Sequence, residues 1–280
     1  MKTRMSILAN AILLSIWSFR AIGAPLEVLH GTEPQYAFDG EGRIVRIKFH
    51  NRDDGKAVES RLFTRIYQES SATAMPIGEP QEWKVLQVPP GQTVTEEAKL
   101  TFPDVRAVTV FQVRCLDDKT NEIGRVKVRV CPRDLLKQLA QEKGTEPVGI
   151  LDPENQIKPL LKNLKIKFQD LDADAGFDEF TGKLAIVGPF SSREKSPDDL
   201  RQRIIGACKK PMSVVWILPP QSEEPVPNLY TVRTGESTVA IVAAHLVAHI
   251  ADSPQAQINL LRCVTLALHP QSLNLPQSKP

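Results

Sequence analysis

The acidic segment that follows Phe168 has the residue types and spacing of a metal-binding loop. The carboxylates that match positions 1, 3, 5 and 9 of a calcium-binding loop are Asp170, Asp172, Asp174 and Asp178. Calcium and magnesium both take oxygen ligands of this kind. Two positions depart from the calcium pattern, because Ala175 stands where a glycine is required and Thr181 where a bidentate glutamate is required. We therefore expect a solvated acidic loop, with a calcium or magnesium site as the alternative.

Three further polar residues follow predicted strands. Asp152 ends the apolar run 148–151, and Ser191 and Ser192 follow the run 184–188. Since open α/β sheets bind ligands outside the carboxyl ends of their strands, these are candidate ligand-binding residues. The Gly-x-Ser-x-Gly turn that would make a serine nucleophilic is missing, so a polar loop fits the two serines better. The sequence indicates no catalytic residue and no cofactor-binding motif.

The histidine pair His245 and His249 has the i, i+4 spacing of zinc ligands on a helix. Ala248 stands where a zinc protease would carry its glutamate, which favours ordinary packed or surface histidines.

The four cysteines fall two in each half of the chain, at Cys115, Cys131, Cys208 and Cys263. An even count suits one disulfide in each half of an exported protein. The apolar alternation around Cys115 and Cys131 places the two on opposite strand faces, which disfavours a bridge between them. The sequence does not decide whether Cys208 and Cys263 form a disulfide.

The first 23 residues predict export. A basic start at Lys2 and Arg4 is followed by an apolar run from Ile7 to Trp17, and small residues stand at Ala21 and Gly23. These are the parts of a secretory signal peptide, and the run is too short to span a bilayer. We expect a periplasmic or extracellular protein without a transmembrane span.

Removal of this segment changes the charge balance. The whole chain has a formal net charge of +2, and the segment contributes three basic and no acidic side chains, so the remainder has a net charge of −1. A broad basic surface for nucleic acid is not indicated.

Residues 24–131 are predicted to be all-β. Short alternating runs at 43–49, 61–67, 82–88, 99–102, 108–115 and 125–130 are separated by turn residues, as in a β-sandwich. A polar connector with a short helix at 134–140 occupies residues 132–147.

Residues 148–269 alternate apolar strands with helices, which indicates a mostly parallel sheet covered on both faces. Strands are expected at 148–151, 165–168, 184–188 and 213–218. Residues 238–244 could begin a helix, but their β-branched side chains favour a hairpin formed by 229–233 and 237–244. A last helix begins at Ser253-Pro254, and the tail 270–280 is expected to be disordered.

The strand order of the first half and its Pro89-Pro90-Gly91-Gln92 turn resemble the immunoglobulin-like accessory domains of exported bacterial proteins. The second half resembles class I glutamine amidotransferase-like domains, in particular non-catalytic versions in exported proteins. This resemblance is carried by 148–151, 183–189, 214–218 and 257–261. It implies a three-layer flavodoxin-like α/β domain. The cysteine nucleophile of active members is missing after the strand at 213–218, where Pro219-Pro220 stands instead.

Taken together, the sequence predicts an exported, non-enzymatic binding or structural protein of the bacterial cell envelope, whose partner is an envelope protein or a glycan. The alternative is a hydrolase or transferase that uses the acidic strand ends with a divalent cation.

Overall fold

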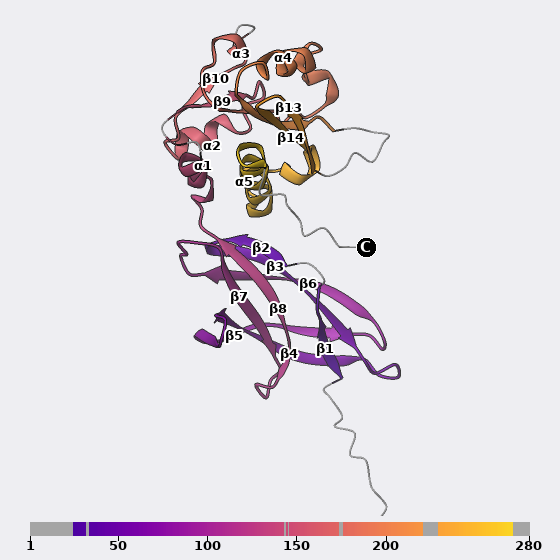
Figure 1. The fold of residues 1–280 in the computed structure, drawn as a ribbon. Helices are drawn as coiled ribbons and strands as arrows, with labels where there is room; N and C mark the ends of the chain where they lie inside the picture. Colours follow the sequence, from indigo (N-terminus) through magenta and orange to yellow (C-terminus); the bar gives the residue numbers. More distant parts are fainter. Residues whose placement is uncertain are drawn as a thin grey trace, which may run out of the picture.

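The computed structural model describes residues 25–31, 34–142, 144, 146–173, 176–220 and 229–270. The predicted signal peptide, Asp174 and residues 271–280 of the predicted tail lie outside these residues. Figure 1 shows a strand-rich first half and an α/β second half, joined through a short connector.

The described part of the first half forms eight strands in two sheets. They are β1 (Leu26–Leu29), β2 (Gln35–Phe38), β3 (Gly40–Asn51), β4 (Val58–Glu69), β5 (Ala74–Val88), β6 (Thr93–Phe102), β7 (Thr109–Leu116) and β8 (Glu122–Cys131). One sheet has the order β1-β3-β6, and the other has the order β2-β8-β7-β4-β5. Phe49, Leu62, Phe102 and Phe111 fill the space between the sheets and are almost fully buried. Burial of these inward side chains is the main force that holds the two sheets together.

The expected immunoglobulin-like sandwich is wrong. Strand β2 pairs parallel with β8, and β3, β4 and β5 run for 12, 12 and 15 residues, well past the short runs expected. The first part of β5 carries Pro76 and Pro80, which read as loop residues in the sequence. Prolines are tolerated there because β5 is an edge strand, whose outer backbone groups have no neighbour.

The connector forms a 3₁₀ turn (Leu135–Lys137) and helix α1 (Gln138–Glu142). Its leucines Leu135, Leu136 and Leu139 are buried in the core of the second half. The connector therefore packs as part of the α/β half.

The second half contains six strands and four helices among the described residues. They are β9 (Val148–Leu151), α2 (Lys158–Asn163), β10 (Phe168–Asp170), α3 (Gly176–Glu179), β11 (Leu184–Val187), α4 (Leu200–Ala207), β12 (Ser213–Leu218), β13 (Leu229–Thr234), β14 (Ser237–Ala243) and α5 (Pro254–Leu268). The sheet order is β10-β9-β11-β12-β14-β13.

The expected flavodoxin-like domain is also wrong, so the fold class expected from the sequence fails in both halves. The sheet is mixed, because β13 runs antiparallel to β14 at the edge beyond it. Among its described residues, the connection from β10 to β11 contains one helix, the four-residue α3. The apolar runs predicted the strands themselves. The length of the connections between strands and the place of the hairpin in the sheet depend on contacts across the sheet, which those runs do not report.

The hairpin of β13 and β14 is confirmed. Its strands pair from Leu229↔Val242 to Thr234↔Ser237 across a two-residue turn. Gly235 takes a positive φ of 62° in this turn, which suits glycine because it has no Cβ.

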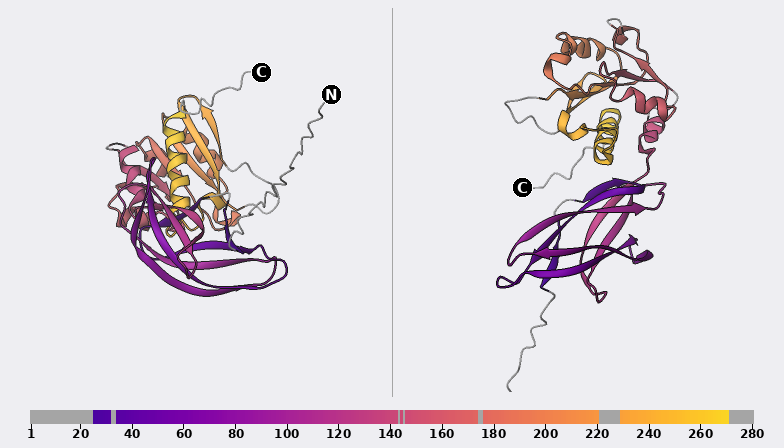
Figure 2. Two further views of the ribbon diagram at one scale, coloured as in Figure 1. Left: turned by 90° about the horizontal axis from the view of Figure 1, so that it is seen from below. Right: turned by 180° about the vertical axis from the view of Figure 1, so that it is seen from behind.

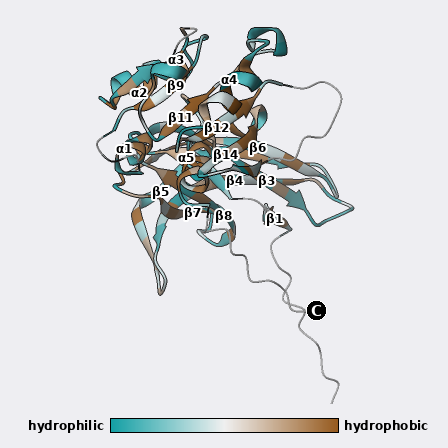
Figure 3. Ribbon diagram, turned by 45° about the horizontal axis from the view of Figure 1, so that its top comes forward, coloured by the Kyte–Doolittle hydropathy of each residue, from teal (hydrophilic) through white to brown (hydrophobic). Residues whose placement is uncertain are grey.

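Two apolar clusters cover the faces of the six-stranded sheet. Helices α2 and α5 lie on one face, and α3 and α4 lie on the other (Figures 1 and 2). The central strands β11, β12 and β14 are hydrophobic along their length (Figure 3). Phe38 and Cys131 from the first half join the α5 cluster, so the two halves share part of one core.

Candidate functional site

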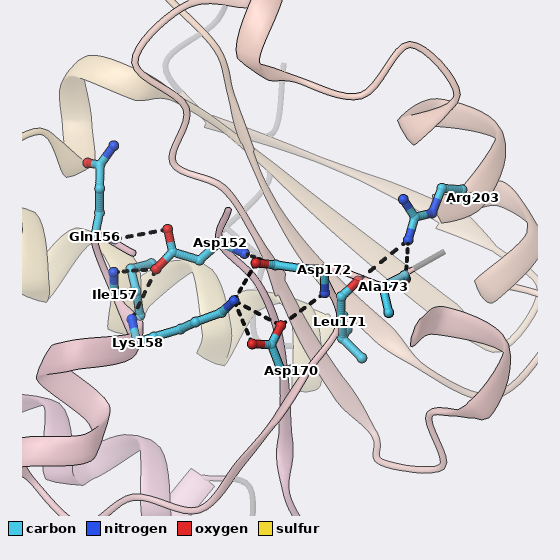
Figure 4. Close-up of polar contacts among 9 residues, drawn as sticks. All are labelled: Asp152, Gln156, Ile157, Lys158, Asp170, Leu171, Asp172, Ala173 and Arg203. Atoms are coloured by element: carbon cyan, nitrogen blue, oxygen red, sulfur yellow. Dashed lines mark hydrogen bonds and ion pairs between the residues drawn. The ribbon is translucent and has the colours of Figure 1, made fainter. Parts of the chain in front are cut away.

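Asp152 stands at the end of β9 and is fully buried. Its carboxylate accepts hydrogen bonds from the backbone N–H groups of Gln156 at 3.0 Å, Ile157 at 2.7 Å and Lys158 at 3.0 Å (Figure 4). These are N–H groups at the start of α2 that have no partner within the helix. Asp152 therefore caps the start of α2, and its full burial keeps it out of contact with solvent.

Lys158 is buried, with a side chain that is 5% exposed. Its Nζ lies 2.8 Å from a carboxylate oxygen of Asp170 and 2.5 Å from one of Asp172. Asp172 also accepts a hydrogen bond of 2.9 Å from the backbone N–H of Asp152. The arrangement ties the carboxyl ends of β9 and β10 together around one ammonium group (Figure 4).

The charges in this cluster stabilise one another. Burial alone would lower the pKa of Lys158, but the hydrogen bonds and negative charges of Asp170 and Asp172 outweigh burial and raise it. Burial would raise the pKa of Asp170, but the Lys158 ammonium and a backbone N–H lower it. Lys158 is therefore protonated at neutral pH, which makes it neither a base nor a nucleophile.

The predicted metal ligands are brought together only in part. Asp170 and Asp172 converge, but on Lys158, whose ammonium occupies the position that a cation between them would take. Asp178 lies exposed on α3, and its side chain takes no part in this cluster. Within the described ranges, no group of three or more His, Cys, Asp or Glu side chains is arranged to hold a metal ion.

Arg203 of α4 fixes the backbone that follows β10. Its guanidinium donates to the carbonyl oxygen of Ala173 at 2.9 Å and lies 5.5 Å from the ring centre of Phe177. The acidic segment is thus held by α4 on one side and by Lys158 on the other.

Ser191 lies at the carboxyl end of β11 and contacts the loop after β9. Its Oγ donates to one oxygen of Glu154 at 2.6 Å, and its backbone N–H donates to the other at 2.5 Å. These bonds lower the pKa of Glu154. A carboxylate with a lowered pKa is a poor general base at neutral pH, so the pair bridges two loops and does not activate the serine.

A groove of about 960 Å³ opens beside this bridge. It lies at the carboxyl ends of β11 and β12, where open α/β sheets bind ligands. Its lining residues are Ser191, Ser192, Arg193, Glu194, Ser196, Pro197, Asp198, Leu200, Arg201, Trp216, Leu218, Pro219 and Pro220. Trp216 is half-buried, and its buried Nε1–H has no hydrogen-bond partner. The two predicted serines therefore line this groove, whereas Asp152 is not among its lining residues.

The histidine and cysteine candidates do not form sites. His245 lies in a 3₁₀ turn, and His249 follows that turn with a φ of 53°, so the two do not share a helix face. All four cysteines are buried free thiols. The prediction that Cys115 and Cys131 lie on opposite strand faces is confirmed. Cys115 packs in the core of the first half, whereas Cys131 packs in the core of the second.

The sequence did not indicate the roles of four residues near the strand ends. These are the contacts of Lys158, Glu154 and Arg203 and the position of Trp216 in the lining of the groove. The only local signal was that Lys158 is a charged residue in an apolar helix pattern, at a position that the helix buries. Its partners are 12 and 14 residues away, and no periodicity reports such a contact.

No helix among the described residues is long and apolar enough to cross a bilayer.

No family model and no curated protein matches the sequence. Solved structures match only in part. An alkylpurine DNA glycosylase of Pseudomonas fluorescens aligns over 39% of this chain and 31% of its own, with 14% identity and a TM-score of 0.28. A β-glucosidase of Listeria innocua aligns over 38% and 16%, with 16% identity and a TM-score of 0.28. A Niemann-Pick type C2 protein of the Japanese carpenter ant aligns over 38% and 89%, with 9% identity and a TM-score of 0.27. The chain thus spans less than a third of the glycosylase and about a sixth of the glucosidase, and TM-scores at this level establish no shared fold.

Proposed function

We propose that the protein is an exported, non-enzymatic binding protein of the bacterial cell envelope, and that the groove beside β11 and β12 takes a glycan. The observation that carries the non-enzymatic part is the position of Lys158, whose Nζ contacts both Asp170 and Asp172. A cation-assisted hydrolase would need these carboxylates free to hold the ion.

The lining of the groove supports a polar, uncharged ligand. Arg193 and Arg201 are balanced by Glu194 and Asp198, so the groove does not select an ion by net charge. Serine hydroxyls, carboxylates and guanidinium groups together supply donors and acceptors for hydroxyl groups. Trp216 is half-buried and adds an aromatic ring to this lining.

Trp83 is the other tryptophan outside the first 23 residues, and it packs away from the groove, in the first half. Its side chain is half-buried, with its ring 5.8 Å from that of Phe49 between centres, and it packs on the core of the first half.

Tryptophan fluorescence tests the proposal directly. In a Trp83→Phe variant without the first 23 residues, which also removes Trp17, Trp216 is the remaining tryptophan. Titration with soluble peptidoglycan fragments, and separately with cellohexaose, should give a saturable change in Trp216 emission with at least one of them. The double variant Arg193→Ala/Arg201→Ala removes two side chains that line the groove, so it should show a smaller change in Trp216 emission. No saturable change with either probe would contradict a glycan ligand.

A melting experiment separates this proposal from the cation-assisted alternative. An ion that binds the folded protein raises its melting temperature. We expect calcium and magnesium at millimolar concentration to leave the melting temperature of the wild-type protein unchanged. A saturable rise would favour the alternative.

A further inference from the structure

The edge strands of the described sheets differ in how they are protected. An exposed edge strand presents unpaired backbone groups and can pair with another chain, and proteins block it by shortness, proline, charge or bulges. Strands β1, β2 and β10 are only four, four and three residues long.

The two long edges of the first half are blocked by their sequence. Strand β5 carries Pro76 and Pro80, and its pairing with β4 is interrupted by two register shifts. Strand β6 carries Glu96, Glu97 and Lys99.

Strand β13 has none of these protections except one charge. Its sequence is Leu-Tyr-Thr-Val-Arg-Thr, and it pairs with β14 in an unbroken register of six residue pairs. No backbone hydrogen bond joins its other side to a further strand among the described residues. Tyr230 and Val232 stand on one face and are 38% and 42% exposed.

The register of the hairpin determines which backbone groups point outward. Thr234 and Ser237 close the two-residue turn and therefore form a hydrogen-bonded pair, as do Tyr230 and Val232 with their partners on β14. The N–H and C=O groups of the intervening residues Leu229, Thr231 and Arg233 consequently face away from β14.

We propose that β13 pairs antiparallel with β13 of a second copy of this chain, about a two-fold axis through Thr231. Only odd-numbered residues present outward groups, so they must face one another. Pairing Thr231 with Thr231 matches Leu229 to Arg233 in both directions and uses every outward group. The same register sets Tyr230 opposite Val232 of the other copy, so that the two exposed side chains cover each other on both sides of the axis.

Cysteine crosslinking tests the register. Directly opposed residues of a hydrogen-bonded antiparallel pair have Cα atoms about 5.5 Å apart, within reach of a disulfide. Thr231→Cys should therefore form a crosslinked dimer under mild oxidation. In the matched control Arg233→Cys, the two cysteines lie about 14 Å apart along the strands and should not crosslink. The native cysteines are buried and do not interfere.

The mass in solution tests the interface. The purified protein should sediment as a dimer, and Thr231→Pro should sediment as a monomer, because proline removes an outward N–H and spares the bonds to β14. Circular dichroism checks that this variant is folded; if it is not, the crosslinking pair decides. A wild-type monomer, an equal yield of crosslink at both positions, or a folded Thr231→Pro dimer would overturn the proposal. A wild-type monomer that instead binds an added extended peptide along β13 would assign the edge to another partner.

Discussion

At the scale of single residues, the position of Lys158 has the largest consequence for function. Its burial costs free energy that the two aspartates offset, and the same contacts engage those carboxylates with an ammonium group. One contact between residues distant in the sequence thus gives two carboxylates of the acidic loop a partner within the chain.

Replacing this lysine should expose the latent cation site. Lys158→Met removes the ammonium group and keeps a side chain of similar length. It should lower the free energy of unfolding by about 1–3 kcal/mol, because two carboxylates lose their shared partner. Calcium should then raise the melting temperature of the variant but not of the wild type. Lys162→Met, on the exposed side of the same helix, is the control and should change neither quantity. An unchanged stability in Lys158→Met would contradict the ion pair.

The same ion pair predicts a pH dependence at both extremes. The pKa of Asp170 is lower in the folded chain, so its share of stability is present above about pH 4 and is lost as the pH falls through the folded value. The pKa of Lys158 is higher in the folded chain, so its share is present below about pH 10 and is lost as the pH rises further. Urea unfolding as a function of pH should therefore show a smaller acid loss in Asp170→Asn than in the wild type. Asp178→Asn should behave like the wild type, and equal acid losses in all three proteins would refute the assignment.

The burial of the cysteines predicts that their thiols react slowly with alkylating reagents in the native protein. Burial raises the pKa of Cys115 and of Cys263 to about 12 and that of Cys131 to about 11, so almost no thiolate is present at neutral pH. Iodoacetamide should leave the mass of the native protein unchanged and add four labels after unfolding in urea. Fewer than four labels after unfolding would reveal a disulfide.

At the scale of elements, the sequence predicted local pairing well and long-range arrangement poorly. The hairpin at 229–243 was predictable because β-branched residues flank a two-residue glycine turn. The parallel pairing of β2 with β8 was not, since it joins residues more than 90 positions apart. The site follows the same division: Ser191 and Ser192 were found from their place after an apolar strand, whereas the Glu154 that binds Ser191 lies 37 residues away.

The start of α2 provides the test at this scale. Asp152→Ala leaves three N–H groups without their acceptor in a buried position and should cost about 2–4 kcal/mol. Asp178→Ala, which removes an exposed aspartate of α3, should stay within about 0.5 kcal/mol of the wild type. Chemical denaturation measures both values. A cost for Asp152→Ala no larger than that of the control would show that α2 does not depend on this cap.

At the scale of the whole molecule, the two halves share part of one apolar core. Phe38 of β2 is 8% exposed and packs in the cluster that contains α5. Each half also carries one tryptophan outside the first 23 residues, Trp83 and Trp216. Variants that retain only one of them therefore report the unfolding of each half separately.

We expect the two reporters to unfold at the same urea concentration, because breaking the shared core exposes apolar surface on both sides. Phe38→Ala should cost about 3–4 kcal/mol and lower both midpoints together. Val85→Ala, at a 53% exposed position of β5, is the control and should move neither. If Phe38→Ala lowered only the Trp83 midpoint, the α/β half would be stable without its neighbour, and the packing of β2 on α5 would be a docking contact between independent units.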